Sequence, residues 1–154
     1  MKTHLVFGLL LTAMLMAPAC VDQGPESADH SGIRAPHARW QAYGLVNYTM
    51  MQQRHSFFVP DGPCKVYVEH NAIVDVIRES DNRSIFLDAP QRYRTVEELF
   101  ALIASLGGDT LSTVKVEYDS LFGYPKILSV QPAQSQIADA GWSYATSDVT
   151  VLLR

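Results

Sequence analysis

The clearest pattern in the chain is an apolar stripe with helical spacing that follows Thr95. Its members lie three or four residues apart, which puts them on one face of an α-helix: Val96, Leu99, Phe100, Ile103 and Leu106. Thr95 and Glu98 have capping-box spacing, in which each side chain satisfies a free backbone N–H at the helix start. Gly107-Gly108 predicts a left-handed stop at the other end.

Alternation of apolar and polar residues predicts strands on both sides of this helix. Before it, the pattern indicates a strand that starts at Val46 and a hairpin over residues 66–76 with Asn71-Ala72 at its turn. After it, alternation predicts strands over residues 114–119 and 126–130. Residues 142–153 fit either one strand or a hairpin bent at Ser147-Asp148.

Two stretches complete the domain. Residues 37–45 predict a short helix with Trp40 on its inner face, and residues 78–94 predict a long loop. The element order is therefore α-β-β-β-α-β-β-β. This order predicts an α+β fold, in which one long and one short helix cover one face of an antiparallel sheet. We expect a single domain over residues 37–154.

The N-terminus has the layout of an export signal. A short basic start is followed by an apolar run over residues 5–16 and by Ala17-Pro18-Ala19, which predicts a signal peptide over residues 1–19. The apolar run is shorter than the roughly 20 residues that span a bilayer. Because Cys20 follows the small residues directly, the segment resembles a lipobox, and we expect acyl chains on Cys20. An ordinary signal peptide cut after Ala19 is the alternative.

Residues 20–36 then predict a flexible tether between the lipid and the domain, because they include only two aliphatic residues larger than Ala. The lipid bilayer is thus one expected partner, bound through the acyl chains. The expected location is a bacterial membrane, on the periplasmic side of the outer membrane in a Gram-negative host, because Val21 is not an Asp.

Charge excludes one class of partner. The chain has 12 Lys and Arg against 16 Asp and Glu, and removal of the signal peptide takes away one further Lys. Nucleic-acid binding requires clustered basic residues, so we expect no nucleic-acid partner.

Cysteine count excludes a disulfide framework. With Cys20 lipidated, Cys64 has no partner in the chain. Such a thiol can pair between molecules, bind a ligand or serve as a small buried apolar residue, and the last is the commonest case.

Catalytic and metal-binding motifs are absent from the sequence. The chain has no nucleophile elbow, P-loop, zinc-protease motif or dinucleotide-binding motif, and its five histidines lack zinc-ligand spacing. We therefore expect no enzyme activity, no cofactor and no metal. Glu117 and Asp119 would lie on one strand face roughly 7 Å apart. This spacing is compatible with glycosidase-like or cation-binding geometry, but Lys115 shares the face, and a solvated strand face is the better explanation.

The segment Tyr118-Asp119 through Gly123-Tyr124-Pro125 is the most distinctive loop. In a structural role, Asp119 accepts backbone N–H bonds within the turn and Gly123 supplies a permissive φ. In a functional role, aromatic side chains form a partner-binding surface. The candidate surface residues are Tyr118, Asp119, Phe122 and Tyr124.

The TVEELF helix start at residues 95–100, the strand 114–119 and the GYP motif at residues 123–125 together resemble a family of small exported bacterial proteins, domain of unknown function 6174. The resemblance covers about residues 38–153. It implies an exported, often lipidated protein and supplies no reaction.

Three functions fit these features. The first is a non-enzymatic, membrane-anchored binding or envelope-associated protein, with an envelope protein or peptide bound at the aromatic loop or an exposed strand edge. The second is a periplasmic inhibitor of a hydrolase, acting through residues 57–63 or 78–94. The third is a small hydrolase that uses Glu117 and Asp119.

Overall fold

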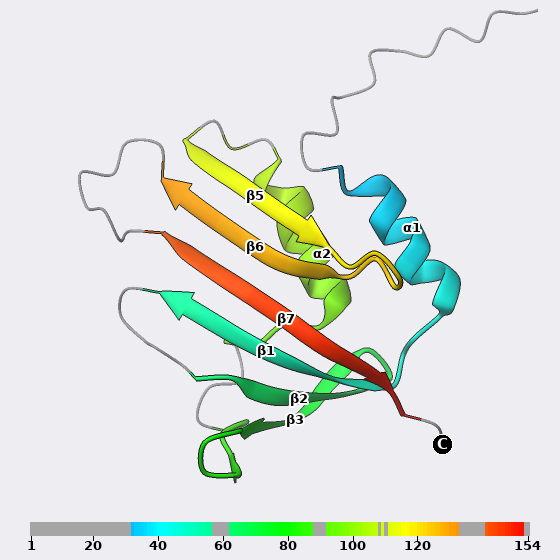
Figure 1. The fold of residues 1–154 in the computed structure, drawn as a ribbon, viewed down its shortest axis with the longest axis vertical. Helices are drawn as coiled ribbons and strands as arrows, with labels where there is room; N and C mark the ends of the chain where they lie inside the picture. Colours follow the sequence, from blue (N-terminus) through cyan, green and yellow to red (C-terminus); the bar gives the residue numbers. More distant parts are fainter. Residues whose placement is uncertain are drawn as a thin grey trace, which may run out of the picture.

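In the described part of the chain, seven strands form one antiparallel sheet, and two helices pack with it (Figure 1). The computed structural model describes residues 32–56, 62–87, 92–107, 109, 111–132 and 141–152. The predicted signal peptide, Cys20 and most of the predicted tether lie outside these residues. The elements follow in the order α1 (Arg34–Tyr43), β1 (Tyr48–Ser56), β2 (Cys64–Glu69), β3 (Ala72–Arg78), β4 (Arg83–Ser84), α2 (Val96–Leu106), β5 (Ser112–Tyr118), β6 (Pro125–Pro132) and β7 (Trp142–Val151).

The strand order across the sheet is β4-β3-β2-β1-β7-β6-β5. Each group of consecutive strands forms a meander of neighbours, and the two groups meet where β1 pairs with β7. This arrangement confirms the predicted α+β class. Figure 1 shows α2 behind β5, β6 and β7, with α1 beyond the ends of β5 and β6.

The predicted element order is wrong in one place, because the predicted loop over residues 78–94 contains the strand β4. Its pairing is short, with Ile77 opposite Ser84 and Arg78 opposite Arg83. Two exposed residues cannot show an alternating pattern, so only pairing with β3 reveals the strand. The next residue, Ile85, is buried and donates its N–H to the carbonyl of Val76 at 2.8 Å.

The short helix predicted over residues 37–45 is displaced, because α1 begins at Arg34, within the stretch predicted as tether, and ends at Tyr43. Pro36 does not prevent this, since the first four N–H groups of a helix have no partner within the helix. The N–H of His37 makes the first bond, to the carbonyl of Ile33 at 2.9 Å. Ile33 itself packs against the core.

The β2–β3 hairpin turns at His70-Asn71, one residue before the predicted position. Both residues have positive φ, 51° and 61°, which is typical of the type I′ turn that suits two-residue hairpins. The side chain of Asn47 accepts the N–H of His70 at 2.9 Å and so fixes the turn against the start of β1.

The capping box of α2 is confirmed. Thr95 Oγ1 accepts the N–H of Glu98 at 3.1 Å, and the carboxylate of Glu98 accepts the N–H of Thr95 at 2.8 Å. The predicted left-handed stop is wrong for Gly107, which has φ −63° and is still right-handed. Gly108 lies outside the described residues.

The strand registers divide the sheet into a helix-facing side and an opposite side. Paired residues such as Tyr48 with Val68, and Met50 with Val66, are fully buried on the helix-facing side. The buried Trp40 of α1 meets Tyr48 edge-on at 5.3 Å between ring centroids. Each large apolar side chain buried here contributes roughly 1.5–3 kcal/mol before conformational entropy is subtracted.

Residues between the buried ones point to the opposite side, which we call the open face. On the three central strands β1, β7 and β6, the side chains of the open face are half-buried or exposed. They are Met51, Gln53, Ile127, Ala145 and Ser147. β7 is a single strand, with a register shift against β1 and with Asp148 at φ 52° where the sequence allowed a bend.

Candidate functional site

The loop between β5 and β6 is closed by its own aspartate. Oδ1 of Asp119 accepts the N–H of Leu121 at 3.0 Å and the N–H of Phe122 at 2.6 Å. The backbone N–H of Asp119 donates to the carbonyl of Tyr124 at 2.8 Å. The predicted structural role of Asp119 in the turn is therefore confirmed.

The same loop packs directly against helix α1. Gly123 has φ +86°, and a Cβ placed there would lie 2.4 Å from the carbonyl oxygen of Pro36. Arg39 donates from Nη1 to the carbonyl of Ser120 at 2.9 Å. The helix and the loop thus meet backbone to backbone, and a glycine is required for that approach.

The aromatic residues of the loop contact other parts of the domain. Tyr118 stacks on Phe100 of α2 at 6.1 Å, and Phe122 meets Tyr43 of α1 at 4.9 Å. Tyr124 is 6% exposed, and burial raises the pKa of its hydroxyl, with Asp119 adding to the shift. A partner surface at this loop remains a prediction, to which the buried Tyr124 contributes little area.

The acidic residues Glu117 and Asp119 differ in their surroundings. β5 ends at Tyr118, so Asp119 lies beyond the strand and its carboxylate binds the turn, while Glu117 is exposed. The expectation that both carboxylates share one strand face is therefore wrong. Glu97 binds His37 of α1 at 2.9 Å. Among the described residues, no group of three His, Cys, Asp or Glu has metal-binding geometry.

A buried polar clamp holds residues 92–96, the approach to α2. Gln52 forms two bonds with the backbone of Arg94, donating to its carbonyl at 3.1 Å and accepting its N–H at 2.9 Å. The hydroxyl of Tyr144 donates to the carbonyl of Arg92 at 3.0 Å, and that of Tyr48 accepts the N–H of Val96 at 3.0 Å. The sequence did not predict this clamp, because a single glutamine in a strand does not indicate which distant backbone groups it will bond.

Cys64 belongs to the same region. Its side chain is fully buried, and Sγ lies 3.0 Å from the hydroxyl of Tyr93. The expectation of a small buried residue is thus confirmed.

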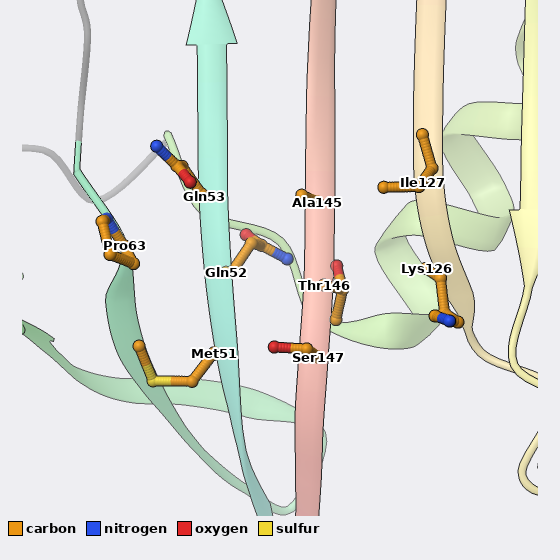
Figure 2. A pocket seen from close by; sticks show the side chains of 9 residues that line it. All are labelled: Met51, Gln52, Gln53, Pro63, Lys126, Ile127, Ala145, Thr146 and Ser147. Carbon is orange, nitrogen blue, oxygen red and sulfur yellow. The ribbon is translucent and has the colours of Figure 1, made fainter.

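A shallow depression of about 220 Å³ lies on the open face, in the middle of the sheet. Figure 2 shows it across β1, β7 and β6, with α2 behind the strands. The small side chains of Ala145 and Ser147 lie between longer ones on both neighbouring strands. Its lining residues are Met51, Gln52, Gln53, Pro63, Lys126, Ile127, Ala145, Thr146 and Ser147.

Register explains why the depression forms. Ala145 is paired with Gln53 on one side and with Ile127 on the other, so a small residue has longer neighbours on both sides. A register shift between β5 and β6 leaves Lys126 out of the pairing. Such a bulge can re-aim a side chain, and Lys126 is exposed and lines the depression.

Lys126 lines the depression, and Lys65 on β2 is paired with Met51, another lining residue. Neither lysine forms an ion pair with any residue that the structure describes. The ammonium of Lys65 lies 5.6 Å from the ring centre of Tyr67. Within the part of the chain that the structure describes, this acidic protein therefore presents two lysines without an ion pair on its open face.

These features define an α+β domain built on a seven-stranded antiparallel sheet in the described part of the chain. The chain matches the family model described as "Family of unknown function (DUF6174)" over residues 33–151, and it belongs to this family. No curated protein and no solved structure matches it. Within the described residues, no helix has the length and apolar character needed to cross a membrane.

Proposed function

We propose that this protein is a non-enzymatic binding protein, anchored to a bacterial membrane by lipid on Cys20. Its open face binds an extended segment of an envelope protein or peptide. The observation that carries the proposal is the depression between β1, β7 and β6, which lies on the side of the sheet away from α2.

The size of the depression favours a side chain of a larger partner over a free small molecule. Pockets for small ligands usually measure about 300–1,000 Å³ and enclose most of the ligand. The depression offers about 220 Å³ and is open to solvent along the sheet. That space suits one anchoring side chain, with the remainder of the partner lying across the strands.

The lining indicates the chemistry of that side chain. Met51, Ile127 and Ala145 offer apolar surface, while Lys126 supplies a cation and Gln53 an amide. An acidic residue with an apolar stem satisfies both parts, because its carboxylate forms a charge-assisted hydrogen bond with the ammonium of Lys126 while its stem lies on the apolar surface. We therefore propose Glu or Asp as the anchoring residue of the partner.

Filling the depression tests the site. Ala145→Trp places a large side chain in it, and Thr113→Trp places the same side chain on the open face of β5, outside the lining. Partner capture from solubilised envelopes should fall strongly for Ala145→Trp and persist for Thr113→Trp. Equal capture by the two variants would exclude the depression as the binding site.

The anchor has its own test. Cys20→Ser should abolish palmitate labelling and release the protein from membranes into the soluble fraction. Wild-type protein that carries no label and is found in the soluble fraction would overturn the lipid anchor, while leaving the open-face site to be judged by capture.

A further inference from the structure

The outer edge of β5 is the longest strand edge without a neighbour in the described part of the chain. β5 pairs only with β6, and its seven residues end the sheet, whereas β4 ends the other side with two residues. Long unpaired edges present backbone N–H and C=O groups that can pair with another strand. The surroundings of β5 indicate which strand that is.

The core is incomplete along this edge. On β6 the helix-facing residues Leu128 and Val130 are 1% and 3% exposed, but their partners on β5, Val116 and Val114, are only half-buried. Leu102 of α2 is half-buried as well and packs against the same cluster. One additional strand beside β5 would cover these side chains.

We propose that the missing strand is β5 of a second copy of this chain, paired antiparallel about a two-fold axis through Val116. In this register Lys115 lies opposite Glu117 of the second copy, and Glu117 lies opposite its Lys115. Both residues are exposed on the open face, and neither has an ion pair within the described chain. Opposite charges directly across a strand pair stabilise it.

Other registers fit the charges less well. An axis at Lys115 places two lysines opposite each other, and an axis at Glu117 does the same with two glutamates, both of which are destabilising. An axis at Val114 places Glu117 and Tyr118 opposite residues that precede β5. The register through Val116 also pairs Val114 with Tyr118 of the second copy, so that apolar residues meet on the helix-facing side.

Two exposed leucines support the same register. Leu111 precedes β5 and is 65% exposed, and Leu121 follows it and is 60% exposed. Antiparallel pairing brings opposite ends of the two strands together, so Leu111 comes to the end at which Leu121 of the second copy lies. The dimer therefore covers the two most exposed large apolar residues that flank this edge.

Charge reversal provides the test, because both residues are exposed and their replacement leaves the core intact. Two full-length copies with different affinity tags are expressed together, and one tag is used to recover the other copy from solubilised membranes. We expect wild-type copies to co-purify. Lys115→Glu and Glu117→Lys should each weaken co-purification at least about fivefold, since two cross-strand pairs become repulsive by symmetry.

The double variant with Lys115→Glu and Glu117→Lys should restore co-purification, because the swapped charges are again complementary. Lys65→Glu makes the same charge change on β2, far from this edge, and should have no effect. Failure of wild-type copies to co-purify, single variants that associate like wild type, or a double variant that stays dissociated would each overturn the proposal.

Discussion

Replacing Gly123 gives the sharpest test of the contact between the β5–β6 loop and α1. Replacement by Ala adds a Cβ where φ is +86°, which costs about 1–2 kcal/mol for an L-residue. It also places that carbon 2.4 Å from the carbonyl oxygen of Pro36, so α1 must move. Overpacking of this kind adds about 1–3 kcal/mol. Gly123→Ala should therefore lower the free energy of unfolding by about 2–5 kcal/mol.

Gly44 provides a matched control. It also has positive φ, +59°, but a Cβ there has open space around it. Gly44→Ala should therefore show only the conformational cost of about 1–2 kcal/mol. At a urea dependence of about 1.5 kcal/mol per M, the unfolding midpoint should fall by about 2 M for Gly123→Ala and by about 1 M for Gly44→Ala.

The measurement is urea unfolding followed by the fluorescence of the two tryptophans, of which Trp40 is buried close to Tyr124. The difference between the two variants isolates the contact between the loop and α1. Equal midpoint shifts would refute the reasoning, because they would mean that the loop can move away from Pro36 without loss.

Two further predictions concern the buried polar groups. Gln52→Leu should lower the free energy of unfolding by about 2–6 kcal/mol, because it removes the side chain that bonds the N–H and the carbonyl of Arg94. The control Gln53→Leu, on the open face, should change the free energy of unfolding by less than about 0.5 kcal/mol. Similar urea midpoints for the two variants would contradict the clamp. Burial raises the pKa of the Tyr48 and Tyr124 hydroxyls, so the stability that their neutral forms contribute is complete below pH 10 and is lost as the pH rises above it. The free energy of unfolding should therefore fall as the pH rises above about 10, and it should fall less in Tyr124→Phe. A free energy of unfolding that stays constant above about pH 10 would refute this linkage.

Local patterns predicted the parts of the fold that local interactions determine. The capping box and the buried face of helix α2 lie within eleven residues, so the local sequence is enough to predict this helix. The alternation in β5 and β6 is similarly visible. The start of α1 was missed because Pro36 and a mostly polar surface obscure the helix, whose partners lie far away at Gly123 and Ser120.

The candidate site could not be predicted because it depends on register between distant strands. Ala145 is an ordinary small residue until its pairing with Gln53 and Ile127 makes it the floor of a depression. Simple alternation places Lys126 with Leu128 on the buried side, and only the bulge beside Glu117 corrects this. The distinctive loop from Tyr118 to Pro125, in contrast, is explained by Asp119 and by its contact with α1.

The most direct test of the binding function is a photoreactive residue placed in the full chain in living cells, at position 53 in the depression or at position 113 outside it. We predict one adduct with an envelope protein other than this chain, which forms from position 53, does not form from position 113, and is lost when Lys126→Glu is added. Equal adducts from both positions, or an adduct from position 53 that survives Lys126→Glu, would contradict the proposal that the open face binds an acidic partner.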